Sequence, residues 1–381
     1  MPIPSNINNP TAKPLRVLIA PLDWGLGHAT RCIPIINELL KNRCEVWLAG
    51  TGSQKALLRE EFPFLPFVDL PGYGVKYTKN RALTSLKLII SIPKILIHIK
   101  QENRWLRHFI AREAPDLIIS DNRYGLYAPD IPTVFITHQL RIRTPFGRWA
   151  DSLLQRIHYR AIRRFSRCWV PDLPGDPSLA GELSHPVQKP SIPTKYIGLL
   201  SRMERTTLLA PVAGEGALTI LLSGPEPQRS LLEEKILDQV DSWSGRVVLI
   251  RGLPGQRDTI GGTRAGMQIF NHLPASTLNN YLQAAEFVIA RAGYSSIMDL
   301  VRLQKKAILI PTPGQTEQEY LGAWLTERKI ALSIGQSRFS LAEALRQARS
   351  FPYTHLDTGG EALLKKEIED LVAYSSPRDF G

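Results

Sequence analysis

The stretch LRVLIAPLDWGLGHATRCIPIINELL (residues 15–40) decides the fold, because it begins as a buried strand and ends as an amphipathic helix. A strand that passes through a short turn into a helix is the unit of α/β proteins with parallel sheets. The turn contains Gly25, Gly27 and His28. Backbone N–H groups at a helix N-terminus favour anions, so we expect this turn to face a ligand. Thr30 replaces the third glycine of a dinucleotide-binding fingerprint, which this turn therefore does not match.

The same strand–helix pattern runs through the rest of the chain in two series. Its apolar runs are continuous rather than alternating, which predicts parallel strands buried on both faces. A stretch rich in Pro, Gly and Ser over 171–193 separates the two series. The pattern predicts two doubly wound α/β domains, with the active site in the cleft between them. The expected strands are 16–20, 44–50, 116–120, 133–137 and 167–171, then 217–223, 246–252, 267–273, 287–293 and 306–312, and a terminal helix is expected at 360–374.

Charge is unevenly distributed along the 381 residues, which carry a formal net charge of +12. Residues 1–190 hold 26 Lys and Arg against 15 Asp and Glu, whereas residues 191–381 hold 21 against 20. Within 141–167 there are eight arginines and a single acid, Asp151. This asymmetry predicts an anionic partner for the N-terminal half, such as phospholipid, a polyphosphate substrate or nucleic acid, although a solvated basic face fits it too.

One segment of this basic region has the pattern of a membrane-surface helix. Residues 148–167 place Trp149, Leu153 and Ile157 on one helical stripe with Ala161 and Phe165, and arginines are interleaved with them. The same stripe would also suit a helix that packs on a core. The apolar segment 83–99 is a second candidate membrane contact, but its two lysines and one proline make it a poor transmembrane helix.

The expected location is the cytoplasm. The first 16 residues lack the apolar region of a signal peptide. Three scattered cysteines form neither a disulfide framework nor a CxxC metal site. No zinc pattern, phosphate-binding P-loop or Asp-x-Asp pair is present, so no metal is expected.

Loops after the later strands carry polar groups that suit a nucleotide sugar. Gly224 and Arg229 follow the strand 217–223 and could cradle a phosphate, although a plain turn is equally compatible. Gly293, Ser295 and Ser296 join the strand 287–293 to a helix, where a phosphate could bind the helix N-terminus.

Two further groups of side chains could bind the sugars of such a ligand. Asp299, six residues after Gly293, could accept hydrogen bonds from ribose hydroxyls. Alternatively, its negative charge could simply interact favourably with the helix dipole. A polar cluster at a Pro-Gly turn suits the hydroxyls of a sugar, or else forms a solvated loop. The cluster consists of Gln315, Glu317, Gln318 and Glu319.

Together these loops resemble the family 28 glycosyltransferases. The strongest resemblance is over 287–325, where an RAG turn, an acid one helical turn later, a strand that ends in Pro311 and a glutamine at 318 keep the order and spacing of the family. The segment GLGHATR (25–31) is similar to the glycine-rich turn of the family. It also resembles a group of sugar-nucleotide hydrolases and uncharacterised glycosyltransferase-like proteins.

The resemblance implies a GT-B fold, in which two Rossmann-like domains face a cleft. The implied parts are an acceptor domain (1–185), a linker (186–216), a nucleotide-sugar domain (217–359) and a C-terminal helix and tail (360–381) that crosses back to the first domain. UDP-linked sugar is the implied donor, with no metal and no other cofactor. Asp299 would hold the ribose and the backbone around His272 the base. Gly293, Ser295 and Ser296 would hold the diphosphate, and Gln315, Gln318 and Glu319 would contact the donor sugar.

The expected reaction is inverting sugar transfer to a sugar- or lipid-linked acceptor. His28 would take the acceptor proton, with Asp23 or a residue of 121–123 or 138–139 as the alternative base. Arg229 or Arg291 would stabilise the leaving diphosphate. On the acceptor side the expected cleft residues are Gly25, Gly27, Asn122, Arg123 and His138.

Departures from the family pattern and competing functions leave some assignments open. Asp299 replaces the usual glutamate, and Glu319 replaces a second glutamine, so the donor sugar is undetermined. The leading expectation is an enzyme that works at the inner face of the cytoplasmic membrane. A UDP-sugar hydrolase is the first alternative, and a basic nucleic-acid-binding protein is the second. Nucleic acid is not the expected partner, since the arginine-rich segment has few interleaved aromatic residues.

Overall fold

The predicted strand–turn–helix unit at the N-terminus is confirmed. A computed structural model describes residues 13–73, 92–144, 146–206, 217–254, 256, 259–261, 265–359 and 361–375. Strand β1 (Arg16–Pro21) is almost completely buried and leads into helix α1 (Gly27–Lys41), whose apolar side packs on the sheet. The glycine turn between them lies at the carboxyl end of β1, where the sequence places it.

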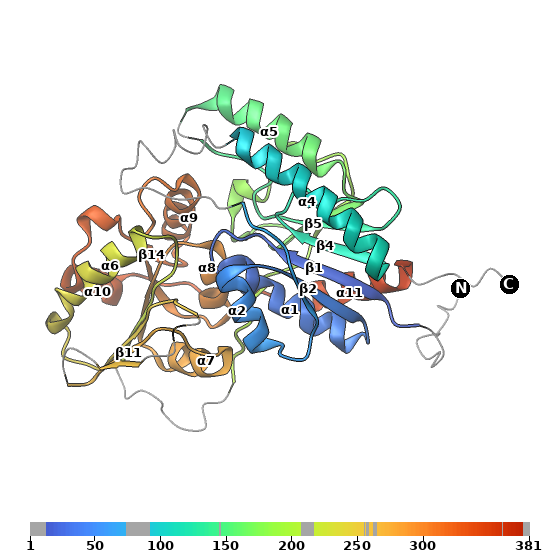
Figure 1. Cartoon of the computed structure of the whole chain (residues 1–381). Coiled ribbons are helices and arrows are strands. Elements are labelled where there is room, and N and C mark those ends of the chain that lie inside the picture. The colour runs from blue at the N-terminus through green and yellow to red at the C-terminus, as the bar shows by residue number, and fades with distance from the viewer. Residues whose placement is uncertain are drawn as a thin grey trace, which may run out of the picture.

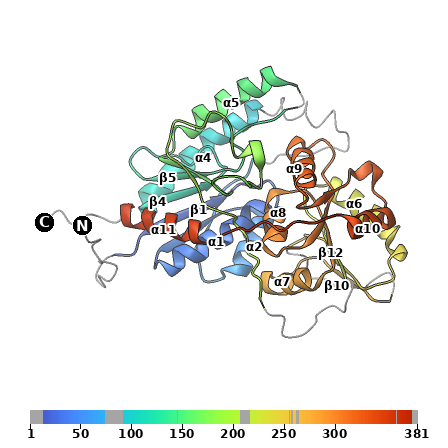
Figure 2. The same ribbon diagram turned by 180° about the vertical axis from the view of Figure 1, so that it is seen from behind.

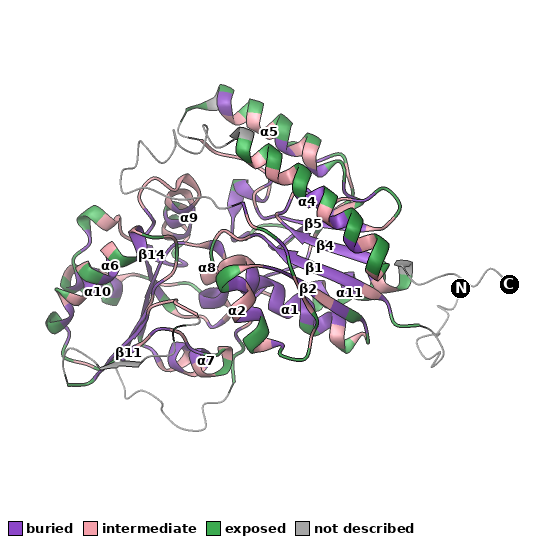
Figure 3. Cartoon of the chain, viewed as in Figure 1, coloured by how far each residue is buried: buried purple, intermediate pink, exposed green. Residues whose placement is uncertain are grey.

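The N-terminal half contains a seven-stranded parallel sheet in the order β3-β2-β1-β4-β5-β6-β7 (Figure 1). Helices cover both faces, and the central strands are buried (Figure 3). The remaining strands are β2 (Glu45–Gly50), β3 (Phe67–Asp69), β4 (Leu117–Asp121), β5 (Thr133–Ile136), β6 (Arg167–Val170) and β7 (Thr194–Tyr196). The helices are α2 (Gly52–Glu61), α4 (Ile92–Glu113), α5 (Arg148–Ile162) and the short η1 (Gly181–Leu183).

The C-terminal half repeats this architecture with a sheet in the order β10-β11-β9-β8-β12-β13-β14, in which β10 pairs antiparallel to β11 and the other pairs are parallel. Its strands are β8 (Leu218–Leu221), β9 (Val247–Ile250), β10 (Thr259–Gly261), β11 (Met267–Phe270), β12 (Phe287–Ala290), β13 (Lys306–Leu309) and β14 (Leu332–Ser333). Its helices are α6 (Gln228–Leu237), η2 (Val240–Ser242), α7 (Ala275–Ala284), α8 (Tyr294–Arg302), α9 (Thr316–Glu327), η3 (Gln336–Arg338) and α10 (Leu341–Ser350).

The last helix, α11 (Ala362–Ser375), returns to the N-terminal half (Figure 2). Its Glu367 accepts hydrogen bonds from Trp169 Nε1 at 3.2 Å and from Arg167 Nη1 at 3.3 Å, and both donors belong to β6. Helix α1 contacts both α8 and α11. One apolar core therefore runs from the first sheet across these helices into the second half.

All ten predicted strands are present, whereas the four short strands β3, β7, β10 and β14 were not predicted. Each has two or three residues and lies at or next to an edge of its sheet. Such segments carry too few residues to show periodicity. β7 lies within the expected linker 186–216 but pairs with β6, so the first sheet extends beyond the Pro- and Gly-rich stretch.

Candidate functional site

The predicted loops that follow β1, β4, β8 and β12 lie at the point in each sheet where the strand order reverses. This point falls between β1 and β4 in the first sheet and between β8 and β12 in the second. Ligands of doubly wound sheets bind at such positions. His28 begins its helix after β1, and Asp121 ends β4 in register with Pro21. Gly224 and Gly293 follow β8 and β12.

His28 belongs to a buried network with two residues that were not selected individually from the sequence, Arg31 and Asp121. His28 Nδ1 lies 3.0 Å from Asp121 Oδ2. Arg31 Nε donates to both Asp121 oxygens, at 3.0 and 2.9 Å. Arg31 Nη2 also lies 2.9 Å from His28 Nδ1. Arg31 can only donate, and its Nη2 also donates to Asp121 Oδ1, so its contact with His28 Nδ1 competes with the bond from that nitrogen to Asp121. A role as base requires the tautomer that donates Nδ1–H to Asp121 and leaves Nε2 as the accepting nitrogen of the ring.

The electrostatics of this network suit a neutral histidine beside a carboxylate. Burial lowers the pKa of His28. The charge of Arg31 lowers this pKa further, while Asp121 partly offsets both effects. Burial alone would raise the pKa of Asp121, but Arg31 and His28 outweigh it and lower that pKa. His28 is therefore unprotonated near neutral pH and able to accept a proton.

His138 joins this network to the C-terminal half. Its Nδ1 lies 3.3 Å from Arg31 Nη1, and its Nε2 lies 2.7 Å from Glu317 Oε1 in the first turn of α9. The His138 ring stacks on Tyr294 of α8, with centroids 4.1 Å apart and planes inclined by 7°. The structure thus places His138 at the interface of the two halves, with Glu317, a member of the polar cluster expected to bind the sugar, as its partner.

The N-termini of α1 and α8 face each other across the same interface. Ser295 Oγ donates a hydrogen bond to the Gly27 carbonyl at 2.7 Å. A Cβ atom at Gly27 would lie 3.0 Å from that hydroxyl oxygen. Gly293 caps α8, and Ser296 is half-buried in its first turn. The two glycine turns predicted separately from the sequence therefore form one site.

Asp299 lies one turn further along α8, against the chain that connects the halves. It is buried, and it accepts a hydrogen bond from Ser201 Oγ at 2.6 Å. Burial raises the pKa of Asp299 to about 6, although Arg202 acts against this. The ribose-binding role of Asp299 stays a prediction, and any ribose would compete with Ser201 for the carboxylate.

His272 follows β11, and α2 of the N-terminal half approaches it. Its Nε2 lies 3.7 Å from Glu60 Oε2, and burial lowers the pKa of this histidine. The neighbouring Glu61 pairs with Arg202 at 3.3 Å. Residues of both halves therefore surround the segment expected to bind the base.

The polar residues at the start of α9 hold its preceding turn. Gln318 Oε1 accepts from the Thr312 N–H at 2.9 Å, and its Nε2 donates to Gln315 Oε1 at 2.5 Å. Glu319 Oε1 accepts from the Gly314 N–H at 3.2 Å. Gln315, Gln318 and Glu319 thus lie together, although their described bonds are internal to the loop.

Arg229, which is expected to face a phosphate, is paired with two carboxylates in this structure. It is buried, donates to Glu226 Oε1 at 2.7 Å and pairs with Glu233 Oε2 at 2.5 Å. Glu233 also accepts from Arg251 at 2.6 Å. The guanidinium is therefore occupied by carboxylates of its own helix and the preceding turn, which lie three and four residues from it.

Arg291 and Arg123 are likewise structural cations and not exposed ligand-binding groups. Arg291 is 1% exposed and donates to the carbonyls of Ile310 and Gln228 and to the Gln336 side chain. Burial lowers its pKa to about 10. Arg123 is completely buried, pairs with Glu102 at 2.5 Å, and donates to the carbonyls of Pro21 and Pro71. Both arginines hold the loops that surround the site.

The remaining predicted residues lie in turns. Gly25 and Gly224 are exposed and have φ angles of 86° and 99°, which glycine adopts without strain. Asn122 has a φ angle of 59°, and its N–H donates to the Ile136 carbonyl at 3.1 Å. Asn122 therefore joins the ends of two neighbouring strands beside Asp121.

Helix α5 exposes the apolar stripe that the sequence predicts. Trp149, Leu153 and Ile157 are 72%, 51% and 53% exposed, and Leu96 and Ile97 of the neighbouring α4 are also exposed (Figure 3). We call these five residues the apolar patch. The stripe is shorter than predicted, because the helix ends at Ile162 and Phe165 is buried. Residues 83–91 of the second expected membrane contact lie outside the described part of the chain.

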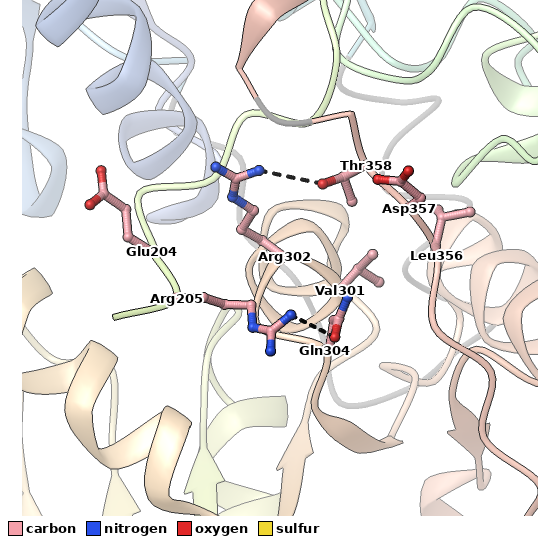
Figure 4. Close-up of a pocket in the computed structure, with 8 residues that line it drawn as sticks. All are labelled: Glu204, Arg205, Val301, Arg302, Gln304, Leu356, Asp357 and Thr358. Atoms are coloured by element: carbon pink, nitrogen blue, oxygen red, sulfur yellow. Dashed lines mark hydrogen bonds between the residues drawn. The ribbon is translucent and has the colours of Figure 1, made fainter. Parts of the chain in front are cut away.

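The described residues also form a cavity that is separate from this site. A cavity of about 360 Å³ lies behind α8 between the two chain segments that connect the halves (Figure 4). Arg205 bonds there to Gln304, and Arg302 to Thr358. No helix in the described part of the chain is both long enough and apolar enough to span a bilayer. Within the same residues, no group of three or more His, Cys, Asp or Glu side chains is arranged to hold a metal ion.

Comparison with known proteins assigns the fold and the C-terminal domain. Residues 261–372 match the glycosyltransferase family 28 C-terminal domain. An uncharacterized glycosyltransferase of Methanosarcina acetivorans is 23% identical over 342 residues, which cover 82% of this chain and 84% of that protein. The UDP-N-acetylglucosamine–N-acetylmuramyl-(pentapeptide) pyrophosphoryl-undecaprenol N-acetylglucosamine transferase of Buchnera aphidicola is 23% identical over 332 residues, which cover 84% of each protein.

Solved structures of glycosyltransferases share the whole architecture. The glycosyltransferase of kitacinnamycin superposes with a TM-score of 0.65 and 16% identity, over 96% of this chain and all of the other. SnogD from Streptomyces nogalater gives a TM-score of 0.57 and 16% identity, over 95% of this chain and all of SnogD. The predicted α/β class with two Rossmann-like halves is thus confirmed: the chain has the fold of GT-B glycosyltransferases, and residues 261–372 match the C-terminal domain of glycosyltransferase family 28.

Proposed function

We propose that the enzyme transfers a sugar from a UDP-sugar to a lipid-linked acceptor, with inversion at the anomeric carbon and without a metal ion. One observation carries the proposal. The buried His28–Asp121 pair at the switch point of the first sheet lies beside the N-terminus of α8, which Ser295 bonds to Gly27. A proton acceptor and an anion-binding helix terminus therefore meet where the two halves join.

The proposed donor site lies in the C-terminal half. Backbone N–H groups of Gly293, Ser295 and Ser296 would bind the diphosphate at the α8 N-terminus, and Asp299 would accept from the ribose. The base would lie near His272, and Gln318 with Glu319 would contact the sugar. The names of several relatives specify UDP-N-acetylglucosamine, which supports a uridine nucleotide. The identity of the sugar is left to experiment.

The proposed reaction is a single displacement. The acceptor oxygen bonds to the anomeric carbon while the bond from that carbon to the diphosphate oxygen breaks. The acceptor proton moves to His28 Nε2, and Asp121 stabilises the resulting imidazolium. The negative charge of the leaving diphosphate is met by the α8 N–H groups. Because Arg229 and Arg291 are occupied by other partners, they are not assigned to this step.

The proposed acceptor side includes the apolar patch of α4 and α5. Exposed arginines Arg156, Arg160, Arg163 and Arg164 surround its α5 part. An apolar stripe with flanking cations is suited to an anionic membrane surface, where each cation contributes about 1 kcal/mol. The acceptor named for several relatives is linked to pyrophosphoryl-undecaprenol. We therefore place the enzyme at the inner face of the cytoplasmic membrane.

The test is a transfer assay with the full chain in mixed micelles. UDP-N-acetylglucosamine, UDP-glucose and UDP-galactose are offered separately, with N-acetylmuramyl-pentapeptide pyrophosphoryl-undecaprenol or with a total lipid extract. Labelled lipid with an inverted anomeric configuration, formed equally with EDTA, is the expected result. Free sugar released at the same rate without any lipid would instead identify a hydrolase. Loss of turnover in EDTA that Mg²⁺ restores would overturn the metal-independent mechanism.

A further inference from the structure

We propose that Glu317 is a positioning residue that makes His28 a stronger base only when the two halves are closed. The inference rests on the proposed role of His28 as the proton acceptor. The observation that supports it is an unbroken series of polar contacts from the C-terminal half to His28. The series runs through Glu317, His138, Arg31, Asp121 and His28.

The directions of these hydrogen bonds follow from the chemistry of the groups. A guanidinium can only donate, so the Arg31 Nη1 contact at 3.3 Å makes His138 Nδ1 an acceptor. His138 then carries its proton on Nε2 and donates it to Glu317 Oε1 at 2.7 Å. The stacked Tyr294 ring fixes the plane of the imidazole. In this tautomer His138 links two charged groups that belong to different halves.

The closed network has one more negative than positive charge. In the N-terminal half the charges of Arg31 and Asp121 cancel. Glu317 of α9 adds a carboxylate, and its pKa is lowered: burial alone would raise it, but His138 and Arg31 outweigh burial. The other titratable groups that face the network are Cys32, whose thiol lies 3.8 Å from Asp121, and Tyr294, and burial raises the pKa of both. A proton that arrives on His28 thus restores neutrality.

This arrangement couples base strength to closure. When the halves separate, Glu317 moves away with α9, and Arg31 and Asp121 remain with His28. The base then loses a favourable negative charge and accepts a proton less readily. Water that reaches a donor in the open enzyme is therefore activated less well than an acceptor hydroxyl in the closed enzyme. Glu317 would thereby favour transfer over hydrolysis.

The first experiment measures proton affinity without substrate. Ring 1H–13C NMR titration of the full chain between pH 4.5 and 9, in the presence of UDP, reports the pKa of His28, with His28→Ala supplying the assignment. Glu317→Gln should lower that pKa by about half a unit or more, and Glu317→Asp should restore most of it. An unchanged or raised pKa in Glu317→Gln would overturn the proposal, as would a wild-type His28 that does not titrate in this range.

The second experiment uses turnover to separate this role from simple docking of the halves. In Glu317→Gln the plateau of kcat should fall about 3- to 10-fold, and its acid limb should move to lower pH, since a base weakened by up to one pKa unit loses at most tenfold in rate. A rise in KM alone, with kcat and the acid limb of its pH profile unchanged, would contradict the proposed role of Glu317. Glu327→Gln, at the exposed end of α9, is the matched control and should match wild type. If His28→Ala keeps its kcat, the proposed base is wrong. If only Glu317→Gln has no effect, this inference alone fails.

Discussion

Ser295 Oγ lies 2.7 Å from the carbonyl oxygen of Gly27, which brings the N-terminus of α8 against that of α1. The two residues are separated by 268 positions and lie on helices that follow strands of different sheets. The positive ends of both helix dipoles therefore face one region, which is favourable for a diphosphate. The absence of a side chain at position 27 is what allows this approach.

Gly27→Val should hold the two helix N-termini apart. A Cβ at this position already reaches 3.0 Å from Ser295 Oγ, and the two methyl groups of valine add further crowding. We expect kcat/KM for the UDP-sugar to fall at least about 10-fold, because a displacement near 1 Å can cost up to about 100-fold. Gly175→Val is the control, since its Cβ would meet no atom within 4 Å. Equal kinetics for both variants would show that the close approach is irrelevant to turnover.

Arg229→Gln should destabilise the protein and leave UDP binding intact. The substitution leaves Glu233 buried with Arg251 as its remaining charged partner. Removal of one member of a buried ion pair costs about 3–5 kcal/mol when the other charge is left uncompensated, so we expect a loss below this range while Arg251 remains. Urea unfolding measures the loss, and calorimetry with UDP on the folded variant measures affinity. A large fall in affinity with unchanged stability would return Arg229 to the phosphate site.

Asp299 should make stability decrease between about pH 4 and pH 6. Its folded-state pKa is about 6, while an unfolded Asp has a pKa near 3.9. As pH rises through this range the unfolded chain loses its proton first, so stability falls by about 3 kcal/mol and is level above pH 6. The urea-unfolding free energy of wild type minus that of Asp299→Asn should follow this curve. A difference independent of pH would contradict the raised pKa.

The same group gives a separate test of ribose binding. If the carboxylate accepts from ribose hydroxyls, UDP-glucose should bind more weakly as pH falls below about 6, because the charged form is lost. UDP-glucose has no phosphate group that titrates in this range. Asp299→Asn should remove the pH dependence and weaken binding by about 1.5–3 kcal/mol. Unaltered affinity by calorimetry would assign Asp299 to its contact with Ser201 alone.

The sequence predicts the fold well because its signals are local. Continuous apolar runs indicate the buried strands, and glycines with positive φ such as Gly25 and Gly224 indicate the turns that follow them. The switch-point rule then places those turns together. Short edge strands such as β7 have no such signal and depend on pairing with a neighbour.

Individual site residues are harder to predict, because their roles depend on contacts distant in sequence. Arg123, Arg229 and Arg291 resemble ligand-binding cations in the sequence, yet protein groups occupy all three. The partners of Arg123 and Arg291 are distant in sequence, whereas those of Arg229 are Glu226 and Glu233 of its own turn and helix. Conversely, the sequence shows Glu317 only as part of a polar cluster, since nothing local predicts its contact with His138. Arg31 offered a weak signal, as it follows His28 by one helical turn.

The apolar patch should bind anionic vesicles. Trp149→Ser with Leu153→Ser removes two exposed apolar side chains without disturbing the buried side of α5. We expect binding to phosphatidylglycerol-containing vesicles in sedimentation assays to weaken about 10-fold or more, and binding of wild type to weaken with added salt. Phe64→Ser, at a site that is 69% exposed beyond the end of α2, is the control. Equal losses in the control would mean that the patch has no special role.

His28→Ala provides the most direct test of the mechanism. If His28 is the base, kcat should fall by about 10²–10⁴, the usual contribution of a positioned acid or base. Donor affinity should change little, because the proposed donor contacts lie in the other half. The buried pair with Asp121 and Arg31 means that some stability is also lost, so melting temperature is measured on the same preparation. A structural histidine would instead give a lower melting temperature and normal kcat per folded molecule. That result would leave the glycine turn with a backbone role and make Asp23 or a residue of the loops after β4 and β5 the base.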